Sequence, residues 1–165
     1  HDFDFDRCKN AGYRILLGLF KKVVIAGRFG VYVDRVFDNI NGYGGLTLLV
    51  AVVFYAIQIY ADFSGCMDMV MGISALFGVD MDENFDKPFF SKSVAEFWRR
   101  WHITLGRFMM NYLYIPLGGN RLGNKRTLFN LFIVFMIKIG AFLIFLYITI
   151  VLFFIYYSLY FLYIK

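Results

Sequence analysis

The chain has 165 residues, about the length of one ordinary domain. Hydrophobic residues make up 60% and aromatic residues 21% of it, whereas typical soluble domains reach only about 45–50% apolar residues even with glycine counted. This composition argues against a soluble globular protein and against a charged disordered tail, because only 18% of the residues are charged. In so apolar a chain, the net charge of +5 indicates anionic lipid headgroups as partners and excludes nucleic acid.

The first predicted element is an amphipathic helix from residue 15 onwards. Apolar residues recur at 15, 16, 19, 20, 23 and 24, with basic residues off that stripe. This pattern indicates an interfacial or tilted helix.

A second apolar segment covers residues 46–61, and the polar side chains Gln58, Asp62, Ser64 and Asp68 cluster at its end. Gly65 predicts a break there, so residues 67–79 form a separate segment that is re-entrant or packed inside a bundle. Asp62 and Asp68 do not share one face of a straight helix, so they do not form an acid/base pair. We expect them to cap helix ends or to pair with arginines.

The spacing of Ser93 and Glu96 predicts a capping box and a helix from residue 94 towards residue 110, with Glu96 and Arg100 paired across one turn. Pro116 ends this ordered run. Residues 87–126 hold eight basic side chains and one acid, which favours the cytoplasmic side of a membrane. Residues 139–164 carry no charge and give the clearest transmembrane prediction. The predicted fold class is therefore all-α, an incomplete multi-pass transmembrane helix bundle.

One stretch combines Trp98, Arg99, Arg100, Trp101 and His102. If the helix is continuous, His102 lies on the same face as Trp98, one turn away. Ionisable residues at membrane depth are costly and are functional candidates by default. The competing interpretation is a structural histidine hydrogen-bonded to a backbone carbonyl near the interface, with the tryptophans in an aromatic belt. The two cysteines, Cys8 and Cys66, have no metal-ligand or redox spacing, and we predict no metal site.

Four blocks carry a resemblance to a known family. They read Gln58-Ile-Tyr-Ala-Asp62-Phe-Ser-Gly65, Glu83-Asn-Phe85, Glu96-Phe-Trp-Arg-Arg-Trp-His-Ile103 and Tyr112-Leu-Tyr-Ile-Pro-Leu-Gly-Gly-Asn-Arg121. In this order and spacing they resemble the membrane-bound O-acyltransferase family. Within it they are most similar to the alginate O-acetyltransferase branch, which includes exopolysaccharide- and peptidoglycan-acetylating proteins.

The resemblance implies a cell-membrane, multi-pass ring of helices with a tunnel. Through it, an acyl group from a cytoplasmic donor, acetyl-CoA or another activated acyl group, reaches a glycan hydroxyl on the far side. The expected partners are the bilayer, the glycan and periplasmic or extracellular acyl-transfer proteins, with no bound cofactor. His102 matches the family's active-site histidine, with a role as base or in positioning substrate. The resemblance places Trp98, Arg99, Arg100 and Trp101 around it as substrate-binding residues, and it makes Gln58, Asp62, Asp68 and Glu96 structural supports.

The chain also departs from the family pattern. The family carries a second histidine on a later apolar helix, and this sequence has only His1 and His102. Met110 and Asn111 stand where Arg-Asp is usual. We therefore expect a partial acyltransferase core over residues 1–135 and a divergent apolar transmembrane tail over residues 136–165, the result of truncation or a frameshift, with no activity of its own. The alternative is a noncatalytic membrane scaffold or an inactive remnant of such an enzyme.

Overall fold

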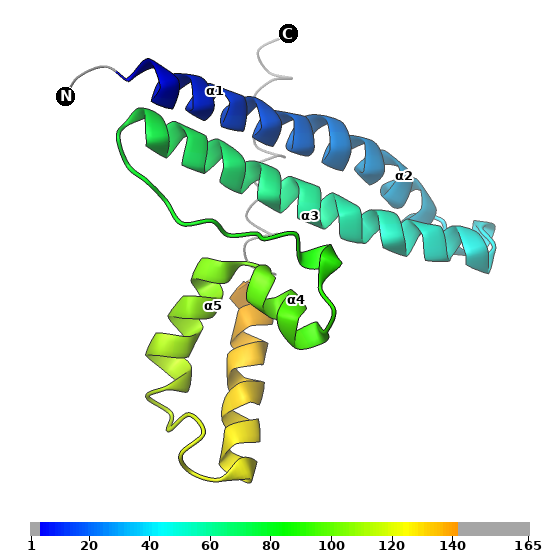
Figure 1. Cartoon of the computed structure of the whole chain (residues 1–165). Helices are drawn as coiled ribbons and strands as arrows, with labels where there is room; N and C mark the ends of the chain where they lie inside the picture. Colours follow the sequence, from blue (N-terminus) through cyan, green and yellow to red (C-terminus); the bar gives the residue numbers. More distant parts are fainter. Residues whose placement is uncertain (1–3, 142–165) are drawn as a thin grey trace, which may run out of the picture. The chain divides into compact units, whose positions relative to one another are not determined.

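The computed structural model describes residues 4–141, which contain helices and no β-strand (Figure 1). The chain divides into two compact units, residues 1–85 and residues 86–165. The predicted transmembrane helix over residues 139–164 lies almost entirely outside the described residues. The all-α prediction is confirmed for the part of the chain that the structure describes.

The first unit is a pair of long helical arms that lie side by side (Figure 1). One arm consists of α1 (Phe5–Leu19), a π-helical segment (Phe20–Ala26) and α2 (Gly27–Phe37), which follow one another without a break. The other arm is α3 (Gly45–Leu76). Residues 5–37 are helical, so the first predicted helix is confirmed, but most of its apolar stripe does not pack against α3. Leu16, Leu19, Phe20, Val23 and Val24 are exposed, whereas Ala11, Gly18 and Ala26 on the same arm are buried.

α3 is continuous through Gly65, and the predicted break at this residue is wrong. Residues 46–61 and 67–79 are not separate segments, because one helix covers residues 45–76. The glycine serves close packing instead. A Cβ atom on Gly65 would lie 2.7 Å from the carbonyl oxygen of Gly18, and one on Gly18 would lie 2.5 Å from the carbonyl oxygen of Gly65. The two helices touch backbone to backbone at this pair, a contact that only glycine permits.

Replacing Gly65 with alanine should therefore weaken the α1–α3 contact by about 1–3 kcal/mol, the usual cost of forcing extra volume into a packed interface. Gly12 is the matched control, because a Cβ atom there meets nothing within 4 Å. Gly12→Ala should stabilise α1 slightly through helix propensity. Reversible unfolding in detergent, followed by circular dichroism, measures both variants. Equal effects of the two substitutions would contradict the packing role of Gly65.

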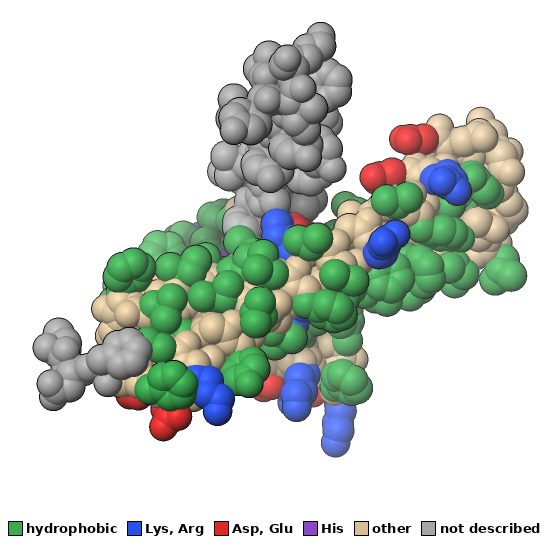
Figure 2. All heavy atoms as spheres, turned by 90° about the horizontal axis from the view of Figure 1, so that it is seen from above, with side chains coloured by type: hydrophobic (Ala, Val, Ile, Leu, Met, Phe, Trp, Pro, Cys, Tyr) green, Lys and Arg blue, Asp and Glu red, His purple; other side chains and the backbone are tan. Residues whose placement is uncertain are grey.

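The surface of this unit is apolar on both arms. Leu16, Val23 and Val31 on the first arm and Leu46 and Leu49 on α3 are all exposed, and the face drawn in Figure 2 carries mostly hydrophobic side chains. α3 has 32 residues, about 48 Å of helix at ~1.5 Å per residue, and among the described residues it is the helix long and apolar enough to cross a membrane. An exposed apolar surface of this kind is favourable in contact with lipid and unfavourable in contact with water.

The second unit is built from shorter helices. α4 covers Val94–Arg100, α5 covers Ile103–Met109, a π-helical segment covers Met110–Tyr114, and residues 124–141 are helical. The predicted capping box is confirmed at its first bond, because Ser93 Oγ accepts the N–H of Glu96 at 3.1 Å. The prediction of one helix from residue 94 towards residue 110 is wrong, because α4 ends at Arg100 and a new helix begins at Ile103.

The turn between α5 and the last helical segment follows Pro116, as predicted. Asn130, fully buried, donates from Nδ2 to the carbonyl oxygens of Leu117 and Gly119 at 3.1 and 3.3 Å. Gly118 and Gly119 both have positive φ, which glycine adopts without strain. These contacts hold the turn against the helix that follows it.

Candidate active site at the break between α4 and α5

The site is organised by the two residues that interrupt the helix. Trp101 is extended, with φ −101° and ψ 121°, and His102 is left-handed, with φ 48° and ψ 63°. Among residues 4–141, His102 and Lys87 are the non-glycine residues with positive φ. Such a conformation costs about 1–3 kcal/mol and persists only where the surroundings enforce it. Trp98, His102 and Leu105 therefore do not share one face of a continuous helix, which corrects the arrangement expected from spacing.

Lys138, on the helical segment of residues 124–141, fills the break. Its Nζ donates to the carbonyl oxygens of Trp98 and Trp101 at 3.0 and 3.2 Å. The same ammonium lies 5.1 Å from the centre of the Trp98 ring, within the range of a cation–π interaction. The carbonyls at the end of a helix lack backbone donors and carry partial negative charge. Lys138 supplies them with both a donor and a positive charge.

Aromatic rings also pack around the break between α4 and α5. The rings of Trp101 and Phe97 stack with centroids 5.5 Å apart, and Trp98 meets Phe135 edge to face at 5.4 Å. The side chain of Trp101 is buried. Trp101 directly precedes His102 in the chain, and Lys138 connects the backbone carbonyls of Trp98 and Trp101.

Two effects lower the pKa of His102, to about 4: first its burial, and then the positive charge of Lys138. The ordinary value is about 6.5. His102 is therefore a neutral imidazole near pH 7, with one ring nitrogen able to accept a hydrogen bond.

The lowered pKa predicts an acid-sensitive fold. Because the folded state binds a proton on His102 less readily than the unfolded chain does, the stability that this histidine contributes is complete above about pH 6.5 and is lost as the pH falls towards 4. The measurement is the free energy of unfolding between pH 7 and pH 4. The matched variant is His102→Asn, since asparagine tolerates the left-handed backbone. Subtracting its pH profile removes the contribution of carboxylates, and a flat difference would contradict the assignment.

The remaining predicted residues of this unit lie on α4. Glu96 Oε1 pairs with Arg100 at 2.7 Å, one turn apart as predicted. Glu96 Oε2 accepts the N–H of Lys92 at 2.8 Å. The pKa of Glu96 is lowered, mainly by this N–H and also by Arg100. Arg99 is exposed. Thus Arg100, the last residue of α4, is paired with Glu96 in the first turn, whereas Arg99 is exposed.

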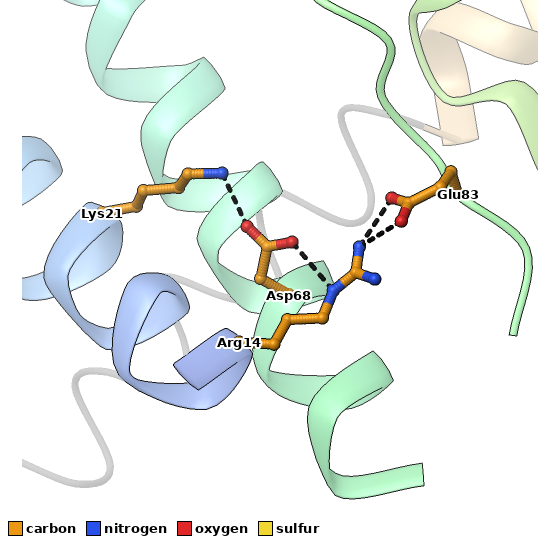
Figure 3. Close-up of polar contacts among 4 residues, drawn as sticks. All are labelled: Arg14, Lys21, Asp68 and Glu83. Carbon is orange, nitrogen blue, oxygen red and sulfur yellow. Dashed lines mark hydrogen bonds and ion pairs between the residues drawn. The ribbon is translucent and has the colours of Figure 1, made fainter. Parts of the chain in front are cut away.

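The predicted carboxylates Asp62 and Asp68 belong to the first unit, where they join α3 to the first arm. Asp62 pairs with Lys22. Asp68 binds two cations at once, Lys21 Nζ at 2.6 Å and Arg14 Nε at 3.3 Å (Figure 3). These pairs follow the interpretation that the acids neutralise basic residues, although lysines take a larger part than the arginines we expected.

Arg14 extends this cluster to the loop after α3. One of its terminal nitrogens lies 2.6 Å from each carboxylate oxygen of Glu83 (Figure 3). Nearer the start of α1, Arg7 donates to the carbonyl oxygen of Ala75 at 2.8 Å and pairs with Asp80 at 2.7 Å. We name the ion pairs of Arg14, Lys21, Lys22, Asp62, Asp68 and Glu83 the charged seam.

Gln58, the last predicted support, lies on α3 beside Gly30. A Cβ atom on Gly30 would come within 3.0 Å of Gln58 Nε2. The other amide atom, Oε1, is buried and has no hydrogen-bond partner among the described residues. Gln58 therefore marks a second place where a glycine lets the two arms approach.

Two features of these sites were not predicted from the sequence. Lys138 was not singled out, although a single charge in the apolar run of residues 131–141 is a signal in itself. The π-helical segment of residues 20–26 was also not foreseen. Such segments often occur at functional positions. Within residues 4–141, no three His, Cys, Asp or Glu side chains are grouped so as to hold a metal ion.

Comparison with known proteins identifies the family of this chain. The model of the membrane-bound O-acyltransferase family matches residues 6–164. The chain therefore belongs to the membrane-bound O-acyltransferase family. The match continues past residue 135, where the recognised motifs end.

Individual relatives place the chain within the family. It is 44% identical over 121 residues to a peptidoglycan O-acetyltransferase of Helicobacter pylori, covering 73% of this chain and 23% of that protein. It is 42% identical over 132 residues to a probable alginate O-acetylase of Pseudomonas putida, covering 80% and 27%. A teichoic acid D-alanyltransferase of Bacillus subtilis is 29% identical over 103 residues, covering 62% and 26%. The chain thus spans about a quarter of the length of the relatives it matches.

Proposed function

We propose that this chain is part of an O-acyltransferase that transfers an acyl group, most simply acetyl, to hydroxyls of a cell-surface or exported polysaccharide. The names of its relatives support the acceptor class, because they include a peptidoglycan O-acetyltransferase and probable alginate O-acetylases at 40–44% identity. The donor is acetyl-CoA or another activated acyl group. The enzyme lies in the cell membrane and crosses it several times, with α3 as one of its spans.

His102 is the residue we assign to the active site, and the observation that carries this assignment is its strained position in the break between α4 and α5. Acyl transfer requires that the attacking hydroxyl be oriented and lose its proton. A neutral imidazole can accept that hydrogen bond and that proton, whereas an imidazolium has no acceptor. The lowered pKa of His102 keeps the ring in the acceptor form near pH 7. His102 needs this neutral form both to act as a general base and to position the substrate hydroxyl.

The neighbouring residues fit supporting roles in the same proposal. Trp98 and Trp101 form apolar walls that exclude water from the reacting ester, and Arg99 and Arg100 offer cations to an anionic donor or glycan. Asp62 and Asp68, through the charged seam, and Gln58 hold the first unit together. Glu96, in the first turn of α4, holds Arg100 at the end of the same helix. Periplasmic or extracellular acyl-transfer proteins are the proposed protein partners.

The test is a chimaera. Residues 6–135 of this chain replace the matching segment of the H. pylori or P. putida relative, and the whole protein is reconstituted in vesicles with a labelled acyl donor and the glycan. We expect the chimaera to transfer label at a rate comparable to the parent. A chimaera that inserts and folds yet transfers nothing would support the alternative, a noncatalytic membrane scaffold or inactive remnant.

A further inference from the structure

We propose that Lys138 is a positioning residue for His102, because its ammonium holds open the break between α4 and α5. The link to catalysis rests on the proposed function, whereas the conformational role of Lys138 does not. Lys138 lies in the segment that the sequence analysis assigned to a divergent tail, and no recognised motif includes it.

The first argument concerns backbone hydrogen bonds. In a continuous α-helix the carbonyl of Trp98 accepts the N–H of residue 102, and that of Trp101 accepts the N–H of residue 105. Here the regular pattern is interrupted between these positions, and the Lys138 ammonium donates to both carbonyls, at 3.0 and 3.2 Å. One side chain from another helix therefore replaces the donors that would otherwise favour continuing α4 through His102.

The second argument concerns charge. Lys138 is only 8% exposed, and no carboxylate among residues 4–141 forms an ion pair with it. A buried cation is costly unless its surroundings compensate for the lost water. The two carbonyls at the negative end of α4 and the face of the Trp98 ring at 5.1 Å provide that compensation. The ammonium and the break therefore stabilise each other.

The consequence falls on His102, which occupies the left-handed position immediately after the second carbonyl. The break sets where the imidazole lies, and the positive charge of Lys138 disfavours a second positive charge beside it. Arg99 and Arg100 on α4 and Arg107 on α5 are the other basic side chains of the flanking helices. The electrostatic part of the lowered pKa of His102 nevertheless comes from Lys138.

The experiment uses the full chain in detergent micelles, with Lys138→Met as the variant and Lys125→Met as the control, since Lys125 is exposed at the start of the helical segment of residues 124–141. The chain has only two tryptophans, and both are at the break, so tryptophan fluorescence, excited at a wavelength that tyrosine does not absorb, reports on this site alone. For Lys138→Met we expect a red-shifted emission, stronger quenching by acrylamide and a rise in the pKa of His102 towards its ordinary value of about 6.5, measured by nuclear magnetic resonance. Lys138→Arg, which keeps charge and donors, should restore the wild-type emission.

The proposal is overturned if Lys138→Met leaves the emission and the pKa of His102 as in Lys125→Met. If Lys138→Met does not fold, as judged by loss of helical circular dichroism, Lys138→Gln is used in its place. The glutamine amide still donates a hydrogen bond but has no charge. A smaller rise in the pKa of His102 is then expected, because the positive charge is lost while burial, the larger cause of the lowered pKa, remains. An unchanged value again rejects the proposal. Neither readout measures acyl transfer, so failure here is distinct from failure of the proposed function.

Discussion

Replacing His102 with alanine in the reconstituted chimaera should reduce acyl transfer by about 10²–10⁴-fold, the range expected when a positioned acid–base group is removed. The reason is that alanine offers the hydroxyl neither a hydrogen-bond acceptor nor a proton acceptor. His102→Asn should be impaired similarly, although asparagine tolerates the left-handed backbone. The measurement is initial transfer of labelled acetyl groups to the glycan.

Two controls distinguish a loss of transfer from a loss of folding. Helical circular dichroism and membrane insertion should be unchanged in His102→Asn, since the substitution preserves the local conformation. Lys125→Met, at the exposed start of the last described helix, should transfer at the parental rate. If His102→Asn lost stability but kept transfer, the histidine would be structural, as the competing sequence interpretation holds.

Replacing Asp68 with asparagine should lower the free energy of unfolding by about 3 kcal/mol, at the low end of what is lost when one partner of a buried ion pair is removed. The side chain of Asp68 is only 13% exposed, and it neutralises both Lys21 and Arg14. Its loss leaves Lys21 without that partner between two packed helices, while Arg14 keeps Glu83. Unfolding titrations in detergent, monitored by circular dichroism, give the difference directly.

Asp80→Asn is the matched control for the charged seam. Asp80 also pairs with an arginine, Arg7, but its side chain is 87% exposed. Exposed ion pairs contribute at most about 1 kcal/mol, so this variant should be close to wild type. A loss at Asp80 as large as at Asp68 would show that burial does not set the strength of these pairs.

Local sequence patterns predicted the features that depend on near neighbours. Ser93 and Glu96 placed the start of α4, and Glu96 and Arg100 formed the expected pair. The apolar stripe from residue 15 identified the first arm. These predictions succeed because capping and one-turn pairing involve residues three or four positions apart, whose geometry any helix fixes.

Predictions that depended on other parts of the chain failed. Gly65 was interpreted as a helix breaker from its own flexibility, whereas its lack of a side chain serves contact with Gly18, 47 positions earlier. Conversely, residues 94–110 have good helical periodicity, yet the helix stops at Trp101. The cause includes Lys138, 36 positions beyond His102, which competes for the carbonyls of α4.

By itself, the sequence determined that this protein is helical, apolar enough for a bilayer and a relative of membrane acyltransferases, because composition and ordered motifs are properties of the chain alone. Only the tertiary structure decided which glycines join helices, which cations neutralise Asp62 and Asp68, and that His102 sits in a strained break. The physical reason is that helix continuity and side-chain charge depend on the groups that packing brings together, and those groups lie tens of residues apart.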